Sequence, residues 1–113
     1  MQSINNTLFT YLISNKEPNS LFDNHIKIKS TKFNIFFSKN TQCHYSEEDN
    51  YGIYVLGFCI DSIKELDREY IPKYLLKVLK DKNIFSQFLS ETDRLAGKFI
   101  ILIKRYDNLY LVG

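Results

Sequence analysis

The sequence predicts an α+β fold in which mostly antiparallel strands and two helices pack in layers. Apolar residues recur with a period of two before residue 62 and after residue 98, and with a helical period in the interval between. The strongest strand segments, 51–61 and 99–103, are apolar on both faces, so each needs a covering layer on both sides. Helices on one side and a second sheet on the other would supply these layers.

Size and composition are those of a soluble globular protein. The chain has 113 residues, 44% hydrophobic and 25% charged, and we expect a single domain, or the N-terminal part of one, over residues 1–113. A net charge of +2 gives no reason to expect a nucleic-acid or membrane partner. Two cysteines, no signal peptide and no long apolar run lead us to expect a cytoplasmic protein with reduced thiols.

The first forty residues contain two predicted strands. Residues 5–13 fit either a short capped helix or an edge strand, and both interpretations stay open. Residues 25–29 alternate and residues 33–37 are dense in strand formers, so we expect a hairpin that turns at 30–32.

The middle of the chain holds the first strongly buried strand. Residues 41–45 could add an edge to the sheet, and 46–50 form an acidic loop. In segment 51–61, Gly57 allows another backbone or a ligand to come close. Alternation places Ile53, Val55 and Cys59 on one face, and Tyr54, Leu56, Phe58 and Ile60 on the other.

Two helices and a hairpin complete the predicted fold. Pro72 suits the first turn of a helix whose wet side bears Lys73, Lys77 and Lys80. A second helix extends from Ile84 to Leu95, and Gly97 is expected to end it. Residues 99–103 and 109–112 then form a hairpin with its turn at Asp107–Asn108.

The residues offer little for catalysis or metal binding. Cys43 and His44 are adjacent on a predicted strand, so their side chains should diverge instead of forming a thiol–imidazole pair. Cys59 lies in the most apolar strand and His25 on an alternating one, which favours a core thiol and an exposed imidazole. The layout lacks the close Cys and His spacings of zinc sites, and there is no phosphate-binding glycine motif, so no cofactor is expected.

The second half of the chain resembles a known family. The resemblance lies in the order of a helix, the segment Leu95-Ala96-Gly97-Lys98-Phe99, an apolar strand, a tight turn and residues 108–112. This order is similar to that of the N-terminal glutaminase-type domain of asparagine synthetase-like proteins, the class II glutamine amidotransferases. The similarity extends from Tyr51 to Gly113. It implies the layered α/β/β/α sandwich of N-terminal nucleophile hydrolases, here incomplete, with Gly113 inside a larger protein.

The departures from that family concern its active site. The family's nucleophile is a cysteine directly after the initiator Met, where this chain has Gln2. Its Asn-Gly-Glu segment would fall at Leu56-Gly57-Phe58, of which the glycine remains. The acidic residue implied three places before Gly97 is Arg94, with Asp93 one place away. The resemblance thus implies a degenerate pocket of Gly57, Phe58, Asp93, Arg94 and Gly97.

We therefore expect a non-catalytic glutaminase-like domain. Its role would be structural, or the binding of a substrate or partner, in support of an ATP-dependent amide-forming domain. Two alternatives remain open at this point. One is a small stand-alone α+β module that binds proteins or peptides through a sheet edge, and the other is a thiol hydrolase that uses Cys43 or Cys59.

Overall fold

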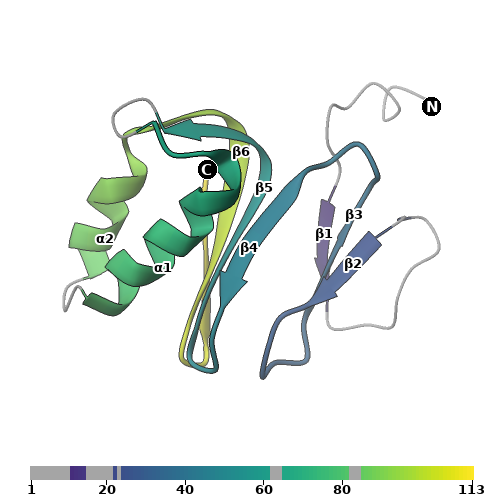
Figure 1. Cartoon of the computed structure of the whole chain (residues 1–113). Coiled ribbons are helices and arrows are strands. Elements are labelled where there is room, and N and C mark those ends of the chain that lie inside the picture. The colour runs from purple at the N-terminus through teal and green to yellow at the C-terminus, as the bar shows by residue number, and fades with distance from the viewer. Residues whose placement is uncertain (1–10, 15–21, 23, 62–64, 82–84) are drawn as a thin grey trace. The chain divides into compact units, whose positions relative to one another are not determined.

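The chain folds into two compact units, residues 1–42 and 43–113, and each is described by itself. The computed structural model describes residues 11–14, 22, 24–61, 65–81 and 85–113. Among these residues there is an antiparallel sheet in each unit, and the second unit also contains two α-helices (Figure 1). The predicted α+β class is confirmed.

The sheet of the first unit has the strand order β1-β3-β2. Its strands are β1 (Tyr11–Ser14), β2 (Asn24–Lys27) and β3 (Asn34–Phe37). The predicted hairpin is confirmed, because β2 and β3 pair antiparallel and the Ile28 N–H donates to the Phe33 carbonyl at 2.9 Å. Of the two interpretations of residues 5–13, the strand holds for Tyr11 onward, and residues 5–10 lie outside the described chain.

The sheet of the second unit has the order β4-β5-β6-β7, all antiparallel. Its strands are β4 (Cys43–Glu47), β5 (Tyr51–Asp61), β6 (Leu95–Arg105) and β7 (Asn108–Val112). β5 has the predicted bounds. β4 forms the predicted edge, but it lies at 43–47 instead of 41–45, because Ser46 and Glu47 of the predicted acidic loop pair with β5. β5 and β6 pair along their whole length, from Tyr51 opposite Arg105 to Asp61 opposite Leu95.

Both helices cover one face of this sheet (Figure 1). A 3-10 turn at Arg68–Tyr70 leads into α1 (Ile71–Asp81), and α2 (Phe85–Thr92) follows. Pro72 is the second residue of α1, where its missing N–H breaks no helical hydrogen bond. The core between helices and sheet contains Ile53, Val55, Cys59, Ile71, Leu75, Leu76, Val78, Leu79, Phe88, Ile101 and Ile103.

The opposite face of the sheet is also apolar, as the alternation predicts. Tyr54, Leu56 and Leu102 are almost fully buried, whereas Phe58 and Ile60 are half-exposed. None of these side chains belongs to the core beneath the helices. The sheet is therefore apolar on both faces, and on the face opposite the helices the side chains of Phe58 and Ile60 are exposed.

The predicted end of the second helix and the predicted final turn were also wrong. The second helix ends at Thr92 and not near Gly97, since the Thr92 hydroxyl bonds back to the Leu89 carbonyl at 2.7 Å and Leu95 already pairs with Asp61. The final turn is Tyr106–Asp107, because Arg105 pairs with Asn108. Tyr106 takes a φ of 56° there, and its N–H donates to the carbonyl of Asn50 in the neighbouring turn.

Two glycines allow β5 and β6 to lie close together where the strands bend. Gly57 has a φ of +104° and Gly97 a φ of +126°. A Cβ on Gly57 would collide with the carbonyl oxygen of Lys98, and a Cβ on Gly97 with that of Phe58. The two sites are reciprocal, because Phe58 and Lys98 are directly paired. Gly97 is thus a strand glycine rather than a helix terminator.

We expect Gly57→Ala and Gly97→Ala each to lower the free energy of unfolding by about 1–3 kcal/mol, because both force a Cβ into backbone atoms at positive φ. Denaturant unfolding followed by circular dichroism measures the change. Gly113→Ala is the matched control: its Cβ would meet the Ile100 side chain at 3.1 Å, which can shift, so the change should stay within about 0.5 kcal/mol. Equal effects at all three positions would refute the close approach.

Candidate functional site

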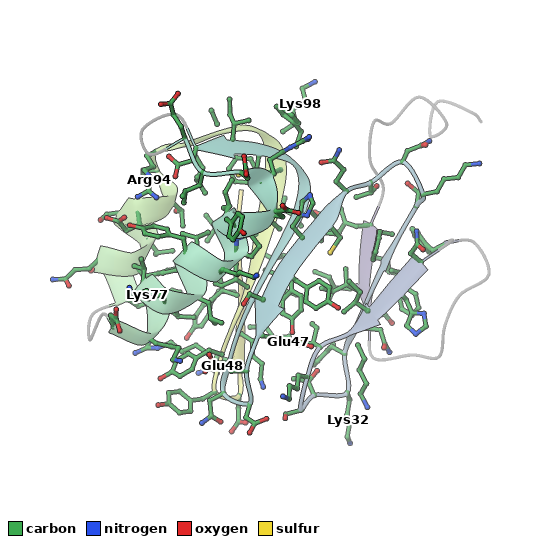
Figure 2. All side chains as sticks on the ribbon, viewed as in Figure 1. Lys32, Glu47, Glu48, Lys77, Arg94 and Lys98 are labelled. Atoms are coloured by element: carbon green, nitrogen blue, oxygen red, sulfur yellow. The ribbon has the colours of Figure 1, made fainter. Side chains whose placement is uncertain are left out.

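A buried ion-pair cluster joins both helices to the end of the central strands. Arg94, between α2 and β6, donates from Nε and Nη2 to the two carboxylate oxygens of Asp61 at 3.1 and 3.0 Å. Its Nη1 donates to Glu91 Oε1 at 2.5 Å, and the Tyr74 hydroxyl donates to the same oxygen at 2.9 Å. The guanidinium also lies over the Tyr74 ring, 4.7 Å from its centroid. Figure 2 shows Arg94 at the end of α2.

The Asp61–Arg94 pair is shielded from water, whereas Glu91 at its rim is partly exposed. The Asp61 side chain is fully buried, and 10% of the Arg94 side chain is exposed. The hydrogen bond to Asp61 is the largest of the effects that raise the pKa of Arg94, so the guanidinium stays charged. A bidentate pair of this kind holds two strand ends in one geometry and leaves the guanidinium little freedom to bind a ligand. The cluster is structural.

The structure separates the residues of the implied pocket. Gly57, Phe58 and Gly97 lie together at the bend of β5 and β6. Phe58 projects from the face opposite the helices, since it alternates with Cys59 of the helix-side core. Arg94 is bound to Asp61, which shares the parity of Cys59 and therefore the helix side. Asp93 is exposed in the turn after α2, and its N–H donates to the Ser90 carbonyl.

Cys43 is partly buried in β4, and Cys59 is buried in β5. Cys43 is opposite Leu56 in the β4–β5 ladder, and His44 is opposite Val55, so the two side chains leave opposite faces of the sheet. Burial raises the pKa of Cys43 to about 12. Burial, followed by the negative charge of Asp61, raises the pKa of Cys59 to about 11. A nucleophilic thiol needs the opposite shift.

The described parts of the chain also lack two other kinds of functional feature. They hold no group of three or more His, Cys, Asp or Glu side chains that could bind a metal ion. None of their helices combines the length and apolar character that crossing a membrane requires.

A row of three lysines beside the sheet edge, the lysine row, is a further feature of the described residues. Lys73, Lys77 and Lys80 of α1 border a shallow hollow of about 250 Å³ together with Ser46 and Glu48 from β4 and its turn, and with Leu76 and Asp81. Figure 2 shows Lys77 on α1 and Glu48 near the β4–β5 turn. The helical spacing of these lysines predicts the solvent-facing side of α1, but no pattern in the sequence indicates that an edge strand lies next to them.

In comparisons with family models, with curated proteins and with solved structures, nothing matches this chain.

We expect Arg94→Met to lower the free energy of unfolding by about 3–5 kcal/mol, because it leaves the buried Asp61 carboxylate without its partner. The double variant Asp61→Leu/Arg94→Met should recover most of this loss. Glu91→Gln is the control, with a loss below about 1 kcal/mol, since the Glu91 side chain is 32% exposed. Denaturant unfolding gives all three values. A double variant that is less stable than Arg94→Met would contradict this account.

We expect both thiols to resist alkylation by iodoacetamide in the folded protein at pH 7–8. A pKa of about 12 in place of 9.0 reduces the thiolate fraction of Cys43 on the order of a thousandfold. Labelling should become fast only as the pH approaches 11–12, or at neutral pH in denaturant. Mass spectrometry of the labelled peptides reads out each site, and rapid labelling of either thiol in the folded chain at pH 7 would contradict the assignment.

Proposed function

We propose that this chain is a non-catalytic glutaminase-like domain related to the front domain of asparagine synthetase-like proteins. Its role is to support an ATP-dependent amide-forming domain, either structurally or by binding a substrate or partner. The complete fold is the layered α/β/β/α sandwich of the N-terminal nucleophile hydrolases.

The order of elements around Gly97 is the observation that supports this proposal most strongly. α2 passes through Arg94 directly into β6, which opens with Leu95-Ala96-Gly97-Lys98-Phe99, turns tightly at Tyr106–Asp107 and returns as β7. This is the helix–strand–turn–strand order of the resembled family. An antiparallel sheet with two helices on one face agrees with one α/β half of the proposed sandwich.

The side chains argue for an inactive member. Arg94, in the place where the resemblance implies an acidic residue, is engaged by Asp61 and Glu91. The raised pKa values of Cys43 and Cys59 keep both thiols protonated at neutral pH. The glutaminase chemistry of the family depends on an activated thiol, which neither cysteine supplies.

A second candidate function is a stand-alone module that binds proteins or peptides, favoured by the position of β4 at the edge of its sheet. The two candidates predict different behaviour for the 113-residue chain. A stand-alone module would be a soluble monomer with one cooperative unfolding transition, whereas half of a sandwich would aggregate or pair with a second copy.

Two measurements test the favoured proposal. The purified chain incubated with glutamine should release no ammonia above the blank, and Cys43→Ser and Cys59→Ser should change nothing. Sequencing the transcript beyond the Gly113 codon should reveal an SGGxDS-type nucleotide loop in the same reading frame. Glutamine hydrolysis that one cysteine substitution abolishes, or a stop codon directly after Gly113, would overturn the proposal.

A further inference from the structure

The outer edge of β4 offers backbone groups for pairing. Glu48 N–H donates to the Tyr51 carbonyl at 2.7 Å, so these two residues form a hydrogen-bonded pair at the start of the β4–β5 ladder. Such pairs alternate with non-bonded ones along antiparallel strands, so the N–H and C=O of Cys43 and Tyr45 point away from β5. No strand of the described chain pairs with this edge.

The lysine row lies beside this edge, on the helix side. Ser46 and the lysines line the same hollow, so the row borders the space that an added strand would enter. The three ammonium groups differ in their surroundings. Lys80 pairs with Glu48 at 2.8 Å, and Lys73 lies 5.2 Å from the Tyr70 ring centroid. Lys77 has no hydrogen bond or ion pair with any described residue, and it is exposed.

The other side of the same edge is aromatic. The Tyr45 ring is 45% exposed and stacks on Tyr54, with 5.7 Å between the ring centroids. The Tyr54 hydroxyl donates a hydrogen bond to the carboxylate of Glu47, which fixes the position of its ring. The edge therefore presents positive charge on its helix side and an apolar ring on its opposite side.

From this arrangement we infer that β4 binds an extended peptide segment in which acidic and apolar residues alternate. The segment adds a fifth strand to the sheet, hydrogen-bonded to the outward backbone groups of β4. Its acidic side chains point toward Lys73 and Lys77, and its apolar side chains pack on Tyr45.

The spacing of the two elements fits this geometry. Alternate side chains of a strand are roughly 7 Å apart. Lys73 and Lys77 are separated by roughly 6 Å along the helix axis. Two successive acidic side chains of the bound strand can therefore each reach one lysine. The site lies within the second unit and does not depend on the glutaminase likeness.

A short acetylated peptide that alternates Glu and Val is the probe, and a peptide that alternates Lys and Val is its counterpart. We expect the acidic peptide to bind the intact chain in a fluorescence-anisotropy titration, at least tenfold more tightly than the basic one, with affinity that falls as salt rises. Equal binding of the two peptides, or no binding of the acidic one, would overturn the inference.

Charge reversal at two matched lysines locates the site. Lys77→Glu should weaken binding about fivefold, since it replaces an attractive pair by a repulsive one. Lys98→Glu makes the same change in net charge on the opposite face of the sheet and should alter binding less than twofold. Figure 2 shows Lys98 at the other end of the sheet from Glu48. Equal losses from both variants would place the peptide elsewhere.

Backbone methylation of the probe tests strand addition without altering the protein. N-methyl groups on every second residue should abolish binding in one of the two possible patterns and spare it in the other, because only alternate N–H groups face β4. The same effect from both patterns would overturn strand pairing. Sedimentation velocity gives the remaining outcome: a dimer that excludes the peptide would assign this edge to a second copy of the chain.

Discussion

The full-length pairing of β5 with β6 is the constraint on which the rest of the second unit depends. Its ladder runs from Tyr51 opposite Arg105 to Asp61 opposite Leu95, and both strands are apolar on both faces. The chain between the two strands must leave and return at the same end of the sheet, so α1 and α2 form its connection. The two helices pack back over the ladder and cover Ile53, Val55, Ile101 and Ile103. β4 and β7 pair with the outer sides of the ladder and form the edges of the sheet.

Two local devices adapt this ladder to the helices. Gly57 and Gly97 remove the Cβ atoms that would separate the backbones at the bend. At the end of the ladder, Arg94 ties Asp61 to Glu91 and Tyr74, so that β5, α1 and α2 meet at one guanidinium. A buried ion pair contributes modestly to net stability, yet losing one partner is costly, so the pair favours this geometry over its alternatives.

The reactive side chains of the second unit divide into buried groups and exposed lysines. Burial keeps the thiols of Cys43 and Cys59 protonated. The buried Asp61–Arg94 pair links elements of the fold to one another and is engaged there. By contrast, Lys77 is exposed and lines a hollow together with Ser46 of β4, whose outer edge pairs with no described strand. This distribution is compatible with both proposed functions, a degenerate glutaminase-like domain and a peptide-binding module.

The α+β class, the bounds of β5 and the assignment of its residues to two faces follow from the sequence alone, because a period of two is a local property of the chain. It predicted the second helix but extended it past Thr92, since Leu95 and Gly97 suit a helix end until their pairing with β5 is known. Only the tertiary structure decided that Arg94 meets Asp61 and that the α1 lysines lie beside β4. Those contacts join residues some thirty positions apart along the chain, and they follow from strand pairing and helix packing, which no local pattern encodes.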